Sequence, residues 1–397
     1  MSGLLSVEEA RARLLALFSP VGTESVPLAA AGGRVLAEDA VATRPQPPFD
    51  ASAMDGYAIR EEDHRAGNRL AVIGASAAGA RFEGAVRPGT AVRIFTGAPV
   101  PDGADRVVIQ ENTTRVEDSV TLDEAAPGGT NIRPAGGDFM PGDRIAAPRR
   151  LAPADLALLA AMNIARPVLR RRPVVALIAT GDELAMPGET PGPDQILCSN
   201  NFGLKAMLEA AGAEARMLPI ARDTPESLTA AFDLAAGADL VVTLGGASVG
   251  EHDLVRATAL GRGLDLSFYK IAMRPGKPLM AGRLGTTPMI GLPGNPVSAM
   301  VCGLLFVLPA VRRMLGLPEE AALRFPARLE AALEPNGPRA HYMMSRAEPE
   351  PGGWRIEAFG RQDSSLLSVL SRANALLVRP PHDPARASGD RVEFLWI

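Results

Sequence analysis

Hydrophobic and polar residues repeat with two different periods along this chain, and the changes of period divide it into segments. Ser6-Val-Glu-Glu9 has the form of a helix capping box, and leucines follow it at helical spacing. This pattern predicts an amphipathic helix at the start of the chain. A second, short helix is predicted over residues 28–36. The run Arg44-Pro-Gln-Pro-Pro-Phe-Asp50 then favours an extended backbone and predicts a boundary.

Short β patterns broken by Gly, Pro and Asp occupy the next hundred or so positions, and they predict a small antiparallel β domain. The expected strands cover residues 69–73, 91–95, 106–109 and 119–122. A helix is predicted from Pro153 to about Asn163, because proline is tolerated in the first turn of a helix.

Beyond Arg170-Arg-Arg-Pro173, apolar runs of strand length alternate with helical segments. The expected strands are residues 173–180, 215–220, 239–244 and 287–292, and the expected helices are residues 201–211, 225–236 and a long one from Pro296. Alternation of helices with almost continuously apolar strands is typical of a doubly wound parallel sheet. After Gly316-Leu-Pro318 the pattern returns to short β runs, which predicts a second small β domain up to Ile397.

The composition fits a globular protein of several domains. A chain of 397 residues is too long for one ordinary core, which favours roughly two to four domains. The net charge of −4 gives no bulk attraction to nucleic acid or to an anionic membrane, so any anion must be bound locally. We therefore expect no nucleic-acid partner.

A cytoplasmic location without membrane contact is predicted. The two cysteines, Cys198 and Cys302, are far apart and form no metal-ligand spacing, which excludes a disulfide framework and fits a reducing compartment. The first residues do not have the form of a signal peptide. The longest apolar run, Val297 to Val311, is short for a bilayer and contains Pro309, so we expect a buried helix.

Four of the expected parallel strands end in polar or glycine-rich turns. Because the carboxyl ends of parallel strands meet at one edge of a sheet, these turns should converge there and form a ligand site. The turns are Thr180-Gly-Asp-Glu183, Ile220-Ala-Arg-Asp223, the segment Gly245 to Asp253, and the segment Gly291 to Ser298.

Two of these turns suit a phosphate-bearing anion. Gly245-Gly246 lets the backbone approach a ligand, and Ser248 adds a hydroxyl donor. Gly294-Asn295-Pro296 leads into a helix whose amino end attracts anions, although a tight helix entry explains this motif equally well. Arg274 and Lys277 could add positive charge. The chain has only three lysines, and two of them, Lys270 and Lys277, lie in this short segment.

Glu183, Asp223 and Asp253 fall on the same edge of the sheet. Carboxylates beside phosphate groups are the usual way in which a protein holds Mg²⁺. Helix capping is an alternative role for Asp223 and Asp253. The sequence contains no Walker motif, dinucleotide fingerprint, H-E-x-x-H or G-x-S-x-G, so several common enzyme classes are excluded.

A set of eight motifs, in the same order, resembles the MoeA family of molybdopterin molybdenumtransferases, which is similar to the gephyrin E domain. The motifs are Ser52-Ala-Met-Asp-Gly-Tyr57, Phe95-Thr-Gly-Ala-Pro99, Arg133-Pro-Ala-Gly-Gly-Asp138, Thr180-Gly-Asp-Glu183, Gly245-Gly-Ala-Ser-Val-Gly-Glu251, Pro275-Gly-Lys-Pro278, Gly291 to Ala299 and Arg372-Ala-Asn-Ala375. Taken alone, the acids Asp55 and Asp138 in the first and third motifs would be read as belonging to surface turns.

The resemblance implies a multi-domain α/β fold around a mostly parallel, MogA-like domain at residues 171–320. A linking and dimerisation domain would take residues 1–45 and 147–170, an inserted β domain residues 46–146, and a C-terminal β domain residues 321–397. It also implies insertion of molybdate into adenylylated molybdopterin with release of AMP, assisted by Mg²⁺. The active form would be an elongated homodimer whose site joins the α/β domain of one subunit to the β domain of the other. The adenylyltransferase that supplies the substrate is a further implied partner.

The resemblance also assigns roles to individual residues. The catalytic positions it implies are Asp55, Thr96, Asp138, Glu183, Asp223, Asp253, Lys270 and Lys277, with Glu183 and Asp253 as metal ligands. The substrate-binding positions are Ser199, Asn200, Gly245, Gly246, Ser248, Arg274, Pro293, Gly294, Asn295 and Ser298.

The chain departs from the family pattern at three places. Cys198 stands before Ser199-Asn200, where Asp or Asn is more common, Arg274 stands where lysine is common, and the segment Gly337 to Arg346 differs. Two other functions stay open. One is an adenylyltransferase or pyrophosphatase that uses the same α/β domain, and the other is a non-catalytic scaffold like that of the gephyrin E domain.

Overall fold

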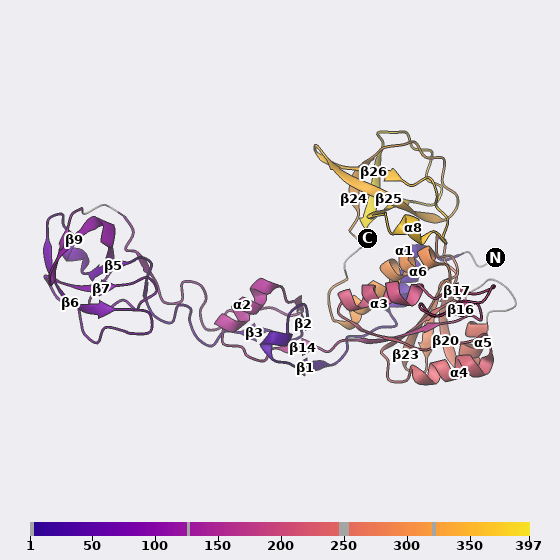
Figure 1. Ribbon diagram of the computed structural model, residues 1–397, viewed down its shortest axis with the longest axis horizontal. Coiled ribbons are helices and arrows are strands. Elements are labelled where there is room, and N and C mark those ends of the chain that lie inside the picture. The colour runs from indigo at the N-terminus through magenta and orange to yellow at the C-terminus, as the bar shows by residue number, and fades with distance from the viewer. Residues whose placement is uncertain (1–3, 125–127, 246–253, 320–322) are drawn as a thin grey trace.

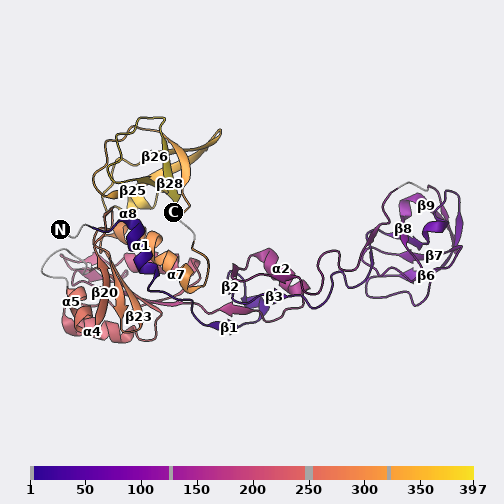
Figure 2. The same ribbon diagram turned by 180° about the vertical axis from the view of Figure 1, so that it is seen from behind.

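The computed structural model describes residues 4–124, 128–245, 254–319 and 323–397. Its three bodies lie in a row along the long axis of the molecule. A small β domain stands at one end, a narrow stalk follows, and the α/β domain with the C-terminal barrel forms the other end (Figure 1). Seen from behind, the barrel again stands beside the α/β domain and away from the stalk (Figure 2).

The predicted first helix is confirmed as α1 (Val7–Leu15). The Ser6 hydroxyl accepts a hydrogen bond from the Glu9 N–H at 3.1 Å, and the Glu9 carboxylate accepts one from the Ser6 N–H at 3.0 Å. These reciprocal bonds form the capping box that the sequence indicates. The apolar side of α1, including Leu14 and Leu15, is buried in the core of the α/β domain.

The stalk contains a four-stranded sheet in the order β1-β14-β2-β13, and helix α2 (Pro153–Ala161) begins at the predicted proline. The predicted helix over residues 28–36 is wrong, because only a 3₁₀ turn forms at Leu28–Ala30. Gly33 has a φ of +71°, which an α-helix does not allow, and the next residues pair as a strand. The strands are β1 (Thr23–Ser25), β2 (Val35–Leu36), β13 (Arg149–Arg150) and β14 (Val168–Arg170), and a separate pair joins β3 (Ala40–Val41) to β12 (Arg144–Ile145).

The small β domain is a six-stranded sheet in the order β8-β5-β7-β6-β10-β9. Four of its strands were predicted and two, β5 and β9, were not. The expectation of a purely antiparallel sheet is wrong at one pair, since β6 and β7 run parallel. The strands are β5 (Gly56–Ile59), β6 (Arg69–Ser76), β7 (Thr90–Ile94), β8 (Arg106–Ile109), β9 (Thr113–Val116) and β10 (Ser119–Leu122), with the short pair β4 (Ala51–Ser52) and β11 (Ile132–Arg133) beside them.

The α/β domain is built on a six-stranded sheet in the order β18-β15-β19-β23-β22-β20. The first four strands are parallel, as predicted, and β22 runs antiparallel to both of its neighbours, β23 and β20. Helices α3 and α6 cover one face together with α1, and α4 and α5 cover the other. The elements are β15 (Val174–Ala179), α3 (Asn200–Ala210), β18 (Glu214–Met217), α4 (Pro225–Leu234), β19 (Leu240–Leu244), α5 (Leu254–Gly261), β20 (Leu264–Tyr269), β22 (Met280–Leu284), β23 (Thr287–Leu292) and α6 (Pro296–Cys302).

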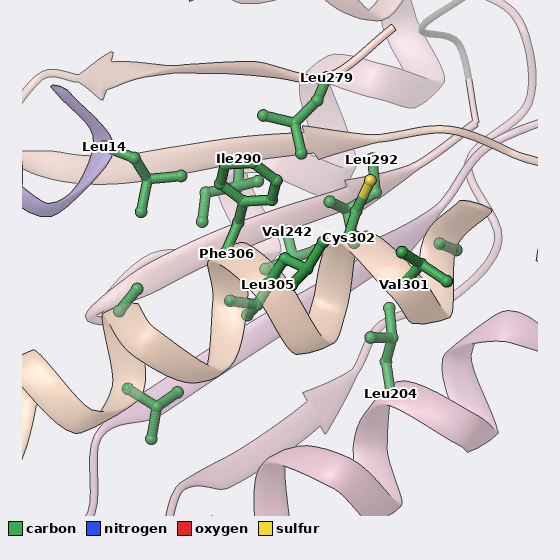
Figure 3. Close-up of a cluster of buried hydrophobic side chains, with 14 of the residues drawn as sticks. Leu14, Leu204, Val242, Leu279, Ile290, Leu292, Val301, Cys302, Leu305 and Phe306 are labelled. Carbon is green, nitrogen blue, oxygen red and sulfur yellow. The ribbon is translucent and has the colours of Figure 1, made fainter. Parts of the chain in front are cut away.

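The apolar run after Pro296 is a core helix, as the sequence predicts. Helix α6 continues through a π-helical turn (Gly303–Val307) into α7 (Leu308–Met314). Its apolar sequence is long enough to cross a membrane, but 67% of the most apolar part is buried within the protein. Figure 3 shows Cys302 and Phe306 of this helix packed against the strands of the sheet.

The C-terminal domain is a closed barrel, because β25 pairs with both β26 and β27. The short strand β21 (Met273–Arg274) leaves the α/β domain and pairs with Ala340–His341 at the start of β25. This pairing attaches the barrel to one loop of the α/β domain. The barrel strands are β24 (Phe325–Leu329), β25 (Ala340–Glu350), β26 (Gly353–Ala358), β27 (Ala375–Arg379) and β28 (Arg391–Trp396), and α8 (Leu367–Leu370) lies between β26 and β27.

An ion pair joins the stalk to the α/β domain. The Arg171 guanidinium donates to both carboxylate oxygens of Asp239, at 2.6 and 2.5 Å, and the Val174 N–H donates to the same carboxylate at 2.8 Å. Partial burial raises the pKa of Asp239, but the bonds from Arg171 and Val174 outweigh burial and hold it below the ordinary value.

We expect Asp239→Asn to destabilise the protein at neutral pH by about 1 kcal/mol, since the pair is partly exposed to solvent. The native pKa of Asp239 is depressed, so its contribution exists above the unfolded-state pKa and is lost as the pH falls through the native pKa. Urea unfolding at neutral and acidic pH measures this difference. Glu209→Gln, which breaks the exposed pair with Lys205, is the control and should change little. An equal effect of Asp239→Asn at both pH values would contradict the assignment.

Candidate functional site

The carboxyl ends of the parallel strands meet with almost no side chains between them. Thr180, after β15, forms a bridge with Ala221, after β18, and its N–H donates to the Leu244 carbonyl at 2.9 Å. A Cβ on Gly245 would lie 2.6 Å from the Thr180 carbonyl oxygen, so this contact requires glycine. A Cβ on Gly294 would lie 3.4 Å from the Gly245 Cα. The turns predicted to converge are therefore in contact.

A cleft of about 570 Å³ opens above these turns. One wall is the segment after β17 (Ile196–Leu197), which pairs with β16 (Leu184–Ala185). The Asn200 side-chain amide donates to the Gly294 carbonyl at 2.6 Å and so connects the two walls. The residues assigned to the site from sequence that line this cleft are Glu183, Ser199, Asn200, Gly245, Pro293, Gly294 and Asn295.

The turns beside the cleft carry several acids, but among the described residues only Glu183 lines the cleft itself. The Asp223 N–H donates to the carboxylate of Asp182 at 3.2 Å, which brings the neighbouring turns together. The capping role considered for Asp223 is wrong, because the hydroxyl of Thr224 accepts the Ser227 N–H and caps α4. Gly246, Ser248 and Asp253 lie outside the described residues.

A second, basic cavity of about 290 Å³ adjoins the cleft, and Pro278 and Asn295 line both. Arg274 and Lys277 come from the loop between β20 and β22, and Arg339 comes from the C-terminal barrel. Within the described chain, none of these three cations forms a salt bridge. Their positive charge is therefore available to an anion.

The barrel also completes the wall between the two cavities. The Asn295 amide donates to the Ser364 hydroxyl at 3.0 Å, and the Val297 N–H donates to the Ser364 carbonyl at 2.9 Å. The free N–H groups at the amino end of α6 were expected to bind a phosphate. This expectation is wrong for Val297, because its N–H already donates to Ser364. Ser298, also assigned from sequence, lines the basic cavity.

A backbone hydrogen bond and a close contact with α6 fix the loop that carries Lys277. The Ile271 N–H donates to the Lys277 carbonyl at 3.0 Å, which narrows the loop at its base. Gly276 has a φ of +109°, and a Cβ there would lie 2.5 Å from the sulfur of buried Cys302. Lys270 lines neither cavity; its ammonium lies 4.7 Å from the ring centre of Tyr269.

Asp55 and Thr96 flank strands β5 and β7 of the small β domain, which lies at the far end of the molecule from the cleft (Figures 1 and 2), whereas Asp138 precedes Phe139, which packs in the stalk core. Asp55 accepts hydrogen bonds from the Thr96 N–H at 2.7 Å and from the Thr96 hydroxyl at 2.8 Å. These bonds hold the pKa of Asp55 below its ordinary value. Asp138 is exposed, and its N–H donates to the Gln46 carbonyl at 2.9 Å.

Two further groups near the site have shifted pKa values. Burial raises the pKa of the Cys198 thiol, which lines the cleft, although the Asn201 N–H donates to the sulfur and opposes this. Burial, with help from Arg274, Arg379 and Arg339, lowers the pKa of His341 to about 4. His341 is therefore neutral at physiological pH and adds no charge beside the basic cavity.

Sequence reasoning missed the contribution of the C-terminal barrel. Arg339 falls in the segment Gly337 to Arg346, which departs from the family pattern, so a signal was present but was not linked to the site. Ser364 had no local signal, because its role follows from contacts with residues about seventy positions away.

Three family profiles match successive parts of the chain. The MoeA N-terminal region (domain I and II) matches residues 5–163, a probable molybdopterin binding domain matches residues 176–313, and the MoeA C-terminal region (domain IV) matches residues 326–397.

Curated relatives and solved structures agree with these profiles. The chain is 36% identical to a molybdopterin molybdenumtransferase of Haemophilus influenzae and 38% identical to molybdopterin molybdenumtransferase 2 of Mycobacterium tuberculosis, with 94% of each chain covered in both cases. A crystal structure of a molybdopterin biosynthesis MoeA protein from Pyrococcus horikoshii is 30% identical over 99% of both chains, with a TM-score of 0.86. A second structure from this organism is 28% identical over 100% of both chains, with a TM-score of 0.83.

We expect Thr96→Val to raise the pKa of Asp55 toward its ordinary value, because valine keeps the backbone N–H donor and removes the hydroxyl. An NMR titration of the side-chain carboxyl carbon measures this. Thr90→Val is the matched control, since the Thr90 hydroxyl donates to the Arg87 carbonyl and does not contact Asp55. An unchanged Asp55 titration in Thr96→Val would show that the hydroxyl contributes nothing.

Proposed function

The chain belongs to the MoeA family, and from this membership and the geometry of the site we propose that it is a molybdopterin molybdenumtransferase. It inserts molybdate into adenylylated molybdopterin and releases AMP, and so completes the molybdenum cofactor. The observation that carries this proposal is the pair of adjoining cavities, one large and polar at its rim, the other small and basic. Such a pair can hold a nucleotide-like substrate beside a separate oxyanion.

The larger cleft suits adenylylated molybdopterin. Its floor consists of the turns at Thr180, Gly245 and Gly294, whose short or absent side chains leave room for a phosphoanhydride. The Ser199 hydroxyl and the Asn200 amide stand on the wall and can orient the substrate by hydrogen bonds. Cys198 makes this wall less polar than Asp or Asn would, so the wall adds no negative charge beside the phosphates.

The basic cavity suits molybdate. The ammonium of Lys277 and the guanidinium groups of Arg274 and Arg339 approach it from two domains. The Asp363 carboxylate also lines the cavity, so one negative charge faces the three cations. It accepts hydrogen bonds from the Ser365 N–H and hydroxyl at 2.8 and 2.6 Å, and these bonds hold its pKa below the ordinary value. Because Asn295 lines both cavities, an oxyanion held here lies next to the pterin cleft.

The rim of the cleft fits a magnesium ion. Glu183 supplies carboxylate oxygens, which Mg²⁺ prefers, and Asp253 would be the second ligand. Among the described residues no group of three metal-ligating side chains converges. A magnesium ion commonly takes one or two carboxylates and otherwise uses water and substrate phosphate oxygens. When bound, Mg²⁺ would polarise the phosphoanhydride.

The chain's own residues have separable roles in this scheme. Glu183 holds the acidic rim and Lys277 holds the oxyanion, so the phosphoanhydride and the molybdate are brought together in a defined orientation. The Lys270 N–H donates to the Leu279 carbonyl at 2.9 Å beside the start of this loop, and we propose that its ammonium adds positive charge near the site. Asp223 does not line the cleft, and its N–H bond to the Asp182 carboxylate supports the turn that carries Glu183.

The complete site needs a second copy of the chain. Asp55 and Thr96 belong to the small β domain, which the stalk holds away from the cleft of its own chain, and Asp138 lies where this domain joins the stalk. We infer that residues 1–45 and 147–170 support a homodimer in which each β domain reaches the cleft of its partner. A soluble, cytoplasmic dimer is the proposed form, with the adenylyltransferase that supplies the substrate as a transient partner.

The proposal is tested by mixing the purified chain with adenylylated molybdopterin, molybdate and Mg²⁺ and measuring AMP release. We expect Lys277→Ala to raise the molybdate concentration needed for half-maximal rate by roughly ten- to a hundred-fold, the equivalent of losing a charge-assisted hydrogen bond. Lys205→Ala is the matched control, because Lys205 pairs with Glu209 on the surface of α3. Absence of AMP release by the wild-type chain would contradict the proposed activity.

The shared site makes a separate prediction. Asp55→Asn and Glu183→Gln should each abolish AMP release as homodimers. After subunit exchange, a mixed dimer has one site with both intact residues, so the mixture should recover about a quarter of the wild-type activity. If both residues acted within the same chain, mixing would restore nothing. Light scattering of the wild-type chain should give the mass of two chains.

A further inference from the structure

The guanidinium group of Arg222 donates hydrogen bonds to three carbonyl oxygens of the turn that carries Glu183. The Nη1 atom of Arg222 donates to the carbonyl oxygens of Gly181 at 3.4 Å, Asp182 at 3.1 Å and Leu184 at 3.2 Å. These carbonyls lie on both sides of Glu183 in the sequence. The turn is therefore curled around the Arg222 cation.

Arg222 is itself held in place from the next strand and helix. Its N–H donates to the hydroxyl of Ser227 in α4 at 2.9 Å, and the following N–H, of Asp223, donates to the Asp182 carboxylate at 3.2 Å. Thr224 caps α4 directly afterwards. Arg222 thus connects α4 and the segment after β18 to the turn after β15 and holds that turn in place.

No donor of the described chain contacts the Glu183 carboxylate, although the Glu183 carbonyl accepts a hydrogen bond from the Ile196 N–H at 2.7 Å. The side chain folds back over Gly181, so that a Cβ at position 181 would lie 2.3 Å from a Glu183 carboxylate oxygen. Gly181 has a φ of +145°, which glycine adopts most readily. The place of the carboxylate at the cleft is consequently set by the backbone of the turn.

We propose that Arg222 is a positioning residue for Glu183: by holding three carbonyls of residues 181–184 it fixes the acidic rim of the cleft. This inference rests on the proposed function only for its effect on catalysis. Arginine suits the role because its planar, delocalised group presents several donors to different acceptors, whereas a lysine ammonium is a compact point charge on a flexible stem.

The test compares Arg222→Ala and Arg222→Lys with Arg216→Ala. Arg216 is the matched control, because it lies on β18 and its guanidinium donates to the Ala236 carbonyl at 3.3 Å, without contacting the turn of Glu183. We expect Arg222→Ala to lower the maximal rate of AMP release by about ten- to a hundred-fold, since loss of geometry at the reacting groups carries penalties of this size. The molybdate requirement should stay unchanged, because Lys277 lies on another loop.

A second readout does not depend on activity. Hydrogen exchange at the backbone amides of residues 181–185 should become faster by about ten-fold or more in Arg222→Ala, because the turn loses the bonds that hold it closed. Arg222→Lys should give intermediate values in both measurements. Arg216→Ala should leave both unchanged.

The outcomes separate this inference from the proposed function. If the wild-type chain releases no AMP, the proposed function fails, and the exchange data alone then decide whether Arg222 orders the turn. If the wild type is active, unchanged exchange or an unchanged maximal rate in Arg222→Ala overturns the inference. A similar loss of rate in Arg216→Ala also overturns it, because that result indicates general destabilisation.

Discussion

The site depends on the close approach of three backbone turns at the carboxyl edge of the parallel strands. Thr180, Gly245 and Gly294 touch almost without side chains, and a Cβ at Gly245 would meet the Thr180 carbonyl oxygen at 2.6 Å. This contact forms the floor of the larger cleft, and it brings the segments on either side within reach of one ligand. Larger residues would separate the turns and fill the space in which a phosphate can lie.

The basic cavity requires a second domain, and a short strand pairing supplies it. Strand β21 joins the C-terminal barrel through β25, and this places Arg339 beside the loop of Arg274 and Lys277. The neighbouring His341 is neutral at physiological pH, because burial and nearby arginines lower its pKa to about 4. The charge of the cavity therefore comes from Arg274, Lys277 and Arg339 and not from this imidazole.

The sequence predicts the parts of the site that depend on local pattern. Apolar strands ending in glycine-rich turns are sufficient to place Glu183 and Gly245 on one edge, because parallel strands leave no other arrangement. Sequence reasoning failed where tertiary contacts decide. The pattern at residues 28–36 resembles a helix, but Gly33 and strand pairing prevent one. Arg339 and Ser364 join the site from a separate barrel, and no short-range spacing shows this.

The elongated shape places a mechanical demand on the stalk. In the homodimer that we propose, Asp55 of one chain must stay in register with Glu183 of the other, because catalysis is sensitive to displacements of about 1 Å. A flexible linker could not do this, since its end would sample a large volume. The paired strands of the stalk and the bidentate contact between Arg171 and Asp239 stiffen the connection instead. Rigidity far from the chemistry is thus a requirement of a site divided between two chains.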